Sequence, residues 1–589
     1  MVSPATLADF ITYCRENYPA DRYGLIFWDH GSGSLSGYGY DQKHSRSGSM
    51  GLSQIKKAVE SSGAKFDFIG FDACLMATVE NALALAGSAD YLIASEETEP
   101  GTGWYYTNWL TDLSRDTSVP TTTLGQRIID DFVDVSARKA RGQDTTLSLV
   151  DLAELQTTFP KAFSAFSKDT GSMIKSEYKT VSTARKSSRE FATSNRIDQI
   201  DLTDLAWKIG TDEGKQLAAV LLGAIKYNRT STSMCNSYGL SIYFPGSRLS
   251  KVDSMVNTYR ELGIDSDYTR CIQQYATVSG SGQAATGGTS SLYDMLSGYG
   301  YGSGSGSSYS GSSSYGSATP SAYGTQSLSG MGSDLLMDLV GSFLTGRSMP
   351  IADLDRSNSA FLKESQLTSD EVVQILSGSA LDSERLKWDT SSGLHVLHLE
   401  PEEWDQVSQL TGNMLFDDGE GFLDLGEDNT YVFNGAGDLQ GETDRTWLSI
   451  NSHPVAFFHI GTVKENGSSV TIGRVPCLLN GDRVNLIIAF DEANPYGYMA
   501  GARYDYVNGE TQTLAKAMTE LQTGDRLDFL CDYYTYDGEY DSTWIIGKPV
   551  YVEDVMVISN TDVGEGGALV TYKFTDLYGQ IYWMEPIRQ

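Results

Sequence analysis

A long Gly/Ser/Tyr tract at residues 280–330 divides this 589-residue chain into two parts. From 301 to 330 the tract contains no Asp, Glu, Lys or Arg (YGSGSGSSYSGSSSYGSATPSAYGTQSLSG). A segment of this composition buries too little apolar surface to offset the entropy of ordering its backbone. We therefore predict a flexible linker over 279–345, which separates a first domain at 1–278 from a second domain at 346–589.

In the first part, short apolar runs alternate with helix-length segments. The runs are YGLIFW (23–28), FDFIGF (66–71), YLIAS (91–95), LSLVD (147–151) and GLSIYF (239–244). Runs that are apolar on both faces are typical of parallel strands covered by helices on each side. We predict an α/β domain with a mostly parallel sheet flanked by helices, whose ligands bind beyond the carboxyl ends of the strands.

Beyond about residue 390 the pattern changes to short alternating segments separated by turn residues, which predicts a β-rich sandwich or barrel with one helix near 511–522. Residues 341–589 hold 15 basic and 40 acidic residues, within a chain of net charge −33. This charge argues against a protein that binds nucleic acid through its phosphates. No apolar run is long enough to predict a membrane span.

Two of the predicted strand ends carry reactive side chains. His30 follows the first run in the segment WDHGSG, and Cys74 follows the second run in the segment FDACLM. A cysteine nucleophile needs a base or a positive field to lower its thiol pKa, and a histidine at the neighbouring strand end can supply it. Gly31 lets the backbone approach a substrate, and its N–H together with that of Cys74 could stabilise an oxyanion.

The alternative is structural, with Cys74 a buried small hydrophobe and His30 a loop histidine, because free cysteine is among the most buried residue types. His44 lies in a polar loop, and Cys14 lies on the apolar face of a helix. Six cysteines in 589 residues are too sparse for a disulfide scaffold or a cysteine zinc site, and the histidines lack a third ligand at suitable spacing. We expect no metal cofactor, although the acidic stretch 417–429 offers oxygen ligands of the kind that calcium takes.

The segments YPADRYGLIFWDHGSG and FDFIGFDACLMATVENALAL resemble the two signature segments of the clostripain-like cysteine peptidases, family C11 of clan CD. The resemblance continues through YLIASEETEPGTGWYY, TTLSLVDLAEL, IDQIDLTDLA and GLSIYFPG, and extends to the β-rich second part. It implies a caspase-like fold and a bacterial, secreted enzyme. It leaves calcium dependence open, because some members of the family require the ion.

The resemblance also assigns roles to individual residues. It makes Cys74 the nucleophile and His30 the general acid and base. Asp72 matches the family position that lines the pocket for the P1 side chain, and a carboxylate there selects Arg or Lys. The local alternative for Asp72 is a helix N-cap. The expected partners are therefore protein or peptide substrates with a basic P1 residue.

Relatives often activate themselves by cleavage after a basic residue between the catalytic His and Cys, and Lys43 and Arg46 are the candidates here. Relatives also carry a segment before the histidine motif, so the chain is expected to be truncated at its N-terminus. If a secretion signal was lost with that segment, the protein is extracellular or on the cell surface; if the start is genuine, it is cytoplasmic. A catalytically inactive binding or adhesion protein that uses the acidic β-rich domain is the alternative function.

Overall fold

The computed structural model describes residues 2–41, 43–44, 48–140, 143–231, 234–285, 340, 360–377, 381–441, 445–465, 468–504, 521–536, 540–564 and 567–589. Most of the predicted linker, residues 511–520 of the helix predicted near 511–522, and Arg46 lie outside these residues. The first residues of the predicted linker are helical, because α12 (Ser266–Ala285) continues through them.

A five-stranded sheet forms the centre of the first part. Its order is β1 (Gly24–Trp28), β2 (Phe66–Asp72), β3 (Ala89–Ala94), β4 (Thr146–Asp151) and β7 (Ile225–Thr230). β1, β2 and β3 are parallel, which confirms an α/β sheet with parallel strands. However, β4 is antiparallel to both β3 and β7, so the prediction of a mostly parallel sheet is wrong for these pairs.

The direction of β4 follows from its connection to β3. Two helices, α5 (Tyr106–Arg115) and α6 (Thr121–Lys139), lie between these strands, and the chain enters β4 at the same end of the sheet at which it left β3. An apolar run reports burial on both faces but carries no information on strand direction. The run at 239–244 belongs to another sheet, where β8 (Ser241–Tyr243) pairs with β6 (Gln199–Asp201), which also pairs with β5 (Glu190–Phe191).

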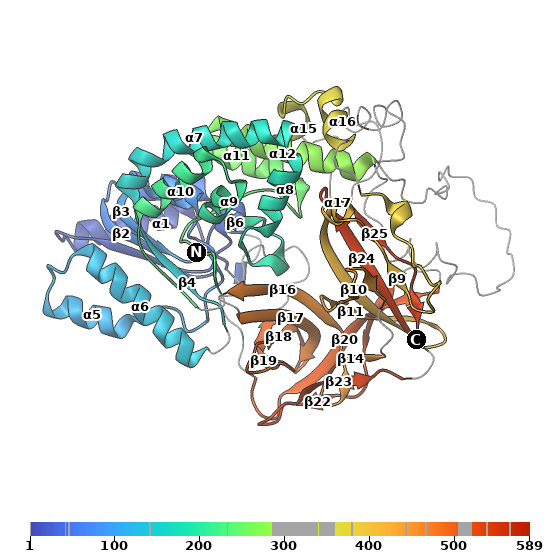
Figure 1. The fold of residues 1–589 in the computed structure, drawn as a ribbon. Helices are drawn as coiled ribbons and strands as arrows, with labels where there is room; N and C mark the ends of the chain where they lie inside the picture. The colour runs from blue at the N-terminus through green and yellow to red at the C-terminus, as the bar shows by residue number, and fades with distance from the viewer. Residues whose placement is uncertain are drawn as a thin grey trace, which may run out of the picture.

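Helices cover both faces of the sheet (Figure 1). On one face, α5 and α6 pack their apolar side chains against β2, β3 and β4. The other face carries the larger core, to which most remaining helices contribute. These are α1 (Pro4–Asn17), α3 (Leu52–Ser61), α4 (Val79–Leu85), α7 (Leu152–Ser176), α8 (Tyr178–Ser187), α9 (Leu202–Ile209), α10 (Asp212–Ala224) and α11 (Val252–Leu262), with α2 (Gly33–Ser36) at the end of β1.

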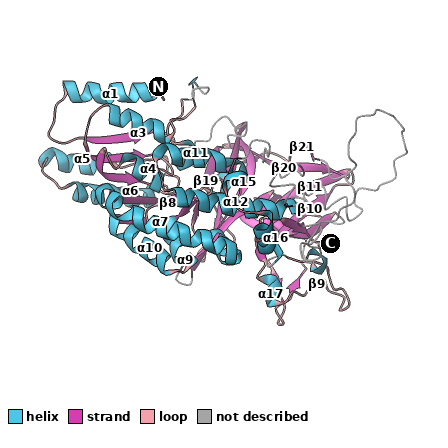
Figure 2. Ribbon diagram, turned by 90° about the horizontal axis from the view of Figure 1, so that it is seen from above, coloured by secondary structure: helices cyan, strands magenta, loops and turns pink. Residues whose placement is uncertain are grey.

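Side-chain caps fix where several of these helices begin. Asp151 accepts a hydrogen bond from the N–H of Glu154 at the start of α7, and Asp201 accepts one from Asp204 at the start of α9. Each cap follows directly on a buried strand, so the chain turns from strand into helix without an intervening loop. The short helices α15 (Phe361–Glu364), α16 (Ser369–Ser377) and α17 (Pro401–Trp404) lead into the second part (Figure 2).

The second part is β-rich, as predicted, and its main sheet closes on itself. The strands that form the ring are β11 (Gly421–Asp428), β16 (Phe457–Glu465), β17 (Ser468–Leu479) and β20 (Arg526–Thr535). β20 pairs with both β11 and β17, while β16 joins β17 to β11, and this circuit makes the barrel. The other strands of this sheet are β10 (Val407–Asp417), β18 (Asp482–Phe490), β19 (Tyr498–Tyr504), β21 (Tyr540–Ile545), β22 (Val550–Tyr551), β24 (Ala568–Asp576), β25 (Ile581–Trp583) and β26 (Ile587–Arg588).

Two small sheets complete the second part. One contains β9 (Val396–Leu397), β12 (Val432–Phe433) and β13 (Leu439–Gln440), and the other contains β14 (Thr446–Ile450), β15 (His453–Pro454) and β23 (Ile558–Asp562). Within the described residues, no helix is both long and apolar enough to cross a membrane.

The turn between β24 and β25 docks the second part onto the first. Tyr578 in this turn is 1% exposed, and its ring stacks on Tyr178 of α8 with 5.2 Å between ring centroids. Its carbonyl accepts hydrogen bonds from Ser279 and Gln283 of α12. Both contacts lie beneath α8 and α12, where Figure 1 shows β24 and β25 meeting the helical layer. The two parts therefore share a packed interface.

Candidate active site

The register of the first two strands brings the two sequence motifs together. Trp28 of β1 pairs with Asp72 of β2 in parallel register, and His30 and Cys74 each lie two residues further along. A Cβ built on Gly31 would lie 2.0 Å from the carbonyl oxygen of Cys74 and 3.1 Å from its nitrogen. The backbones of the two motifs are thus in direct contact, and only glycine fits at position 31.

The backbone of His30 is fixed at this strand end. Its N–H donates to Asp29 Oδ1 at 2.6 Å, and its carbonyl accepts from the N–H of Gly39 at 2.8 Å. The imidazole lies edge-on to the ring of Tyr40, with 6.3 Å between centroids, and the residue is half-buried. Nearby Trp28 is 71% exposed, so a large aromatic surface faces solvent beside the motif.

The Cys74 thiol is buried, with no exposed surface. It packs in a small cluster with Leu75, Phe191, Ala192 and Ile197. The N–H of Glu99 donates to Cys74 Sγ at 3.3 Å, which favours the charged form of the sulfur. The structure therefore describes a covered thiol, which becomes accessible only if the covering residues move.

The residue after the cysteine has a strained backbone. Leu75 adopts a φ of 67°, which is costly for a side chain branched beyond Cβ and is over-represented at functional sites. Two contacts hold it there: its N–H donates to the Glu97 carbonyl at 3.1 Å, and its own carbonyl accepts from Gln199 Nε2 at 3.1 Å. This sharp turn is what presents the Cys74 backbone to Gly31.

Asp72 is fully buried, and its carboxylate accepts two hydrogen bonds. The Trp104 N–H donates to Oδ1 at 3.3 Å and the Tyr106 hydroxyl donates to Oδ2 at 2.9 Å. Burial, followed by the charge of Asp72, raises the pKa of the Tyr106 hydroxyl far above its usual value. No helix begins at Asp72, since α4 is capped by Thr78, so the N-cap alternative is wrong.

Three glutamates follow β3, and all are buried. Glu96 accepts from the Gly239 N–H and lies against Asp201, and burial raises the pKa of both, that of Asp201 to about 7. Glu97 accepts from the N–H groups of Thr98 and Ala192. Glu99 accepts from the Trp104 indole at 3.3 Å. This last contact links the surroundings of Cys74 to those of Asp72.

Sequence reasoning missed Trp104, Tyr106, Glu99 and the cover over Cys74. The sequence signal for Trp104 and Tyr106 was the glycine that precedes them in the run PGTGWYY. In the structure this residue, Gly103 (φ 58°), lies so close to Asp72 that an added Cβ would be 2.9 Å from the carboxylate. Of the proposed self-cleavage residues, Lys43 is exposed in the segment between His30 and Cys74, and Arg46 lies outside the described residues.

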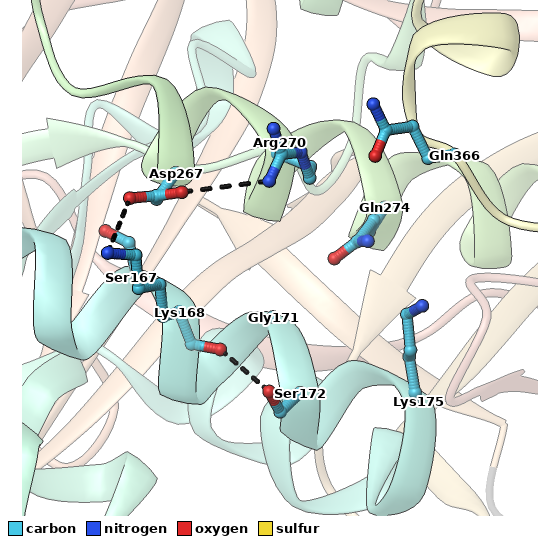
Figure 3. A pocket seen from close by; sticks show the side chains of 9 residues that line it. All are labelled: Ser167, Lys168, Gly171, Ser172, Lys175, Asp267, Arg270, Gln274 and Gln366. Carbon is cyan, nitrogen blue, oxygen red and sulfur yellow. Dashed lines mark hydrogen bonds and ion pairs between the residues drawn. The ribbon is translucent and has the colours of Figure 1, made fainter.

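No cluster of three or more potential ligands in the described part of the chain could hold a metal ion. Within the acidic stretch 417–429, Asp417 is paired with Arg588 and accepts from the Tyr536 hydroxyl. A pocket of about 420 Å³ lies elsewhere, between α7 and α12 (Figure 3). In it Asp267 pairs with Lys168 and Arg270, and none of the candidate residues lines it.

Residues 1–258 match the sequence profile of the clostripain family. Clostripain of Hathewaya histolytica is 32% identical over 123 residues, a match that covers 18% of this chain and only 23% of that protein. The match therefore spans about a quarter of the curated relative.

Two solved structures are also similar to this chain. An inactive zymogen of a C11 protease from Parabacteroides distasonis is 22% identical over 44% of this chain and 76% of that one, with a TM-score of 0.35. A secreted C11 cysteine protease from Bacteroides thetaiotaomicron, solved with an irreversible peptide inhibitor, is 22% identical over 44% of this chain and 78% of that one, with a TM-score of 0.33.

Proposed function

We propose that this chain is an endopeptidase of the clostripain family that cleaves peptide bonds after Arg or Lys, because residues 1–258 match the sequence profile of that family. The observation that carries the proposal is the contact between Gly31 and the Cys74 backbone, which joins the two motif-bearing strand ends. The buried carboxylate of Asp72 belongs to the last residue of β2, two residues before Cys74.

In the proposed reaction, the Cys74 thiolate attacks the carbonyl carbon that follows the basic residue. The oxyanion is stabilised by backbone N–H groups of Gly31 and Cys74. His30 donates a proton to the leaving amine, and water then hydrolyses the thioester with His30 as base. The Glu99 N–H, at 3.3 Å from the sulfur, adds a donor that stabilises the thiolate before attack.

Basic P1 specificity is assigned to Asp72. In the closed structure its two oxygens are occupied by the Trp104 N–H and the Tyr106 hydroxyl. A guanidinium or ammonium would replace or supplement these neutral donors with a donor of opposite charge, and in a buried site that added attraction favours a basic P1 side chain. Asp72→Asn should therefore lower cleavage after Arg far more than it lowers cleavage after an uncharged residue.

The decisive experiment is labelling of the full chain with an arginyl acyloxymethyl ketone, followed by mass spectrometry of the modified peptide. We expect modification at Cys74 and none in Cys74→Ala. Hydrolysis of an arginyl amide that persists in Cys74→Ala would refute the assignment. Lys43→Ala with Arg46→Ala should leave the chain intact where the parent is cut between His30 and Cys74, and a fully active parent that stays one chain would contradict self-cleavage.

One observation favours the alternative of a binding or adhesion protein: the thiol of Cys74 is completely buried. A scaffold would keep this thiol covered under all conditions, and the arginyl ketone would then fail to label the full chain. The extracellular or cell-surface location and any calcium requirement stay predictions. Secretion by a host that expresses the full gene and activity measured with and without a chelator would test them.

A further inference from the structure

A short segment that consists of β5 and the loop leading to β6, residues 190–198, covers the candidate nucleophile, and we call it the lid segment. Phe191, Ala192 and Ile197 from this segment pack in the same apolar cluster as Cys74. The thiol has no exposed surface as a result. Substrate access therefore depends on what holds the lid segment in place.

The two ends of the lid segment are anchored to α8. Arg185 of α8 is 3% exposed, pairs with Glu190 at 2.9 Å and lies 3.6 Å from Asp198. Between the anchors the backbone is strained, since Ala192 and Arg196 have φ values of 46° and 49°. A left-handed conformation costs a non-glycine residue about 1 kcal/mol. Tertiary contacts, rather than local backbone preference, therefore hold the middle of the lid segment in this conformation.

Glu97 makes a polar contact with that middle. Its Oε2 accepts the Ala192 N–H at 3.1 Å, and its Oε1 accepts the Thr98 N–H at 2.7 Å. Burial raises the pKa of Glu97, and the charge of Arg503 opposes this shift.

Arg503 belongs to the other part of the chain. It lies on β19 of the β-rich domain, and its guanidinium donates to Thr98 Oγ1 at 3.3 Å. β19 thus contacts the loop that follows β3. In this loop Glu97 accepts the Ala192 N–H of the lid segment, and the Glu99 N–H donates to the sulfur of Cys74. Neither the His30 motif nor the Cys74 motif contributes to the contact between Arg503 and Thr98.

We propose that the β-rich domain is an internal inhibitor, which keeps the lid segment closed over Cys74 through Arg503, Thr98 and Glu97. Displacement of β19 would release Glu97 and Ala192 and expose the thiol to substrate. The regulatory meaning rests on the proposed peptidase function, whereas the closure itself does not. In energetic terms the closed and open states form a two-state equilibrium that Arg503 biases.

The test compares alkylation of Cys74 by iodoacetamide in the parent chain and in Arg503→Ala, quantified by mass spectrometry. Loss of one hydrogen bond of ordinary strength should raise the rate at Cys74 about fivefold. Arg526→Ala is the matched control, because Arg526 lies in the same domain and pairs with Asp528 of its own strand. Arg503→Lys should restore slow alkylation. Equal rates at Cys74 in the parent and in Arg503→Ala would overturn the proposal.

Cys271 in α12 serves as the reference for global unfolding, because burial raises its thiol pKa strongly and leaves it unreactive. If Arg503→Ala exposes both cysteines, the same alkylation assay is applied to Thr98→Val, which removes the acceptor within the first domain. Faster alkylation of Cys74 alone supports the proposal, and a rate equal to that of the parent overturns it.

Arginyl amide hydrolysis in the same samples separates the two proposals. If Cys74 is exposed in Arg503→Ala but no sample hydrolyses the amide, the peptidase proposal fails and the closure stands. If the parent hydrolyses the amide and Arg503→Ala changes neither readout, the closure fails and the peptidase stands.

Discussion

Replacement of Tyr578 by alanine tests how strongly the β-rich domain is docked on the first domain. The ring is 1% exposed, stacks on Tyr178 at 15° and lies so close to α12 that a Cβ on Gly282 would come within 2.6 Å of it. Truncation of a buried aromatic residue to alanine costs about 3–5 kcal/mol, because the contacts are lost and a cavity remains. The hydrogen bonds to the Tyr578 carbonyl are unaffected by the change, so the loss isolates the ring.

Differential scanning calorimetry of the full chain measures this effect. For domains of this size, about 4 kcal/mol corresponds to a fall in melting temperature of about 10 °C. Tyr551→Ala is the control, since Tyr551 lies in the same domain but is 55% exposed, and it should shift the melting temperature by less than about 2 °C. If Tyr578→Ala melts like Tyr551→Ala, the turn between β24 and β25 does not dock the two domains and the reasoning is refuted.

Two further predictions concern a buried carboxyl group and the contact at the site. Burial raises the pKa of Asp424 to about 6, so the folded state binds a proton that the unfolded state has lost, and the stability falls as the pH rises from about 4 to 6. Asp424→Asn should flatten this pH dependence, measured by urea unfolding, and should stabilise the chain at pH 7 by up to about 3 kcal/mol. An unchanged pH profile would contradict this prediction. Gly31→Ala should slow labelling of Cys74 by the arginyl ketone about 100-fold, because the added Cβ displaces the Cys74 backbone, whereas Gly51→Ala, with open space around it, should label at the parental rate.

The positions of the two motifs could be predicted from the sequence because they depend on local pattern. The apolar runs before His30 and Cys74 form β1 and β2, and adjacent parallel strands place their carboxyl ends at one edge. The β-rich character of the second part also follows from alternation within single strands. In each case the information lies within a few residues of the feature that it predicts.

The direction of β4 and the docking of Tyr578 could not be predicted in this way. Strand direction depends on the path of α5 and α6, which hydrophobic periodicity does not report. Tyr578 lies in the turn between β24 and β25, which would be expected to be exposed because turns usually lie at the surface. It is buried because Tyr178 and α12 supply a cavity from the other domain, and such a contact leaves no mark on the local sequence around either partner.

The same distinction separates the chemistry of the candidate site from its accessibility. The groups proposed to react, His30 and Cys74, come from two short motifs with fixed backbone contacts. Ala192, which packs against Cys74, and Arg503, which contacts Thr98, come from distant segments. Ala192 donates a hydrogen bond to Glu97, and Arg503 donates one to Thr98 Oγ1. Bonds of this kind contribute about 1 kcal/mol each, so loss of the Arg503 contact should shift the balance between the closed and open states modestly, while the apolar packing of the lid segment and its anchors to Arg185 remain. Substitutions in the motifs should therefore abolish the reaction, whereas substitutions along the path from Arg503 to Ala192 should change how fast it begins.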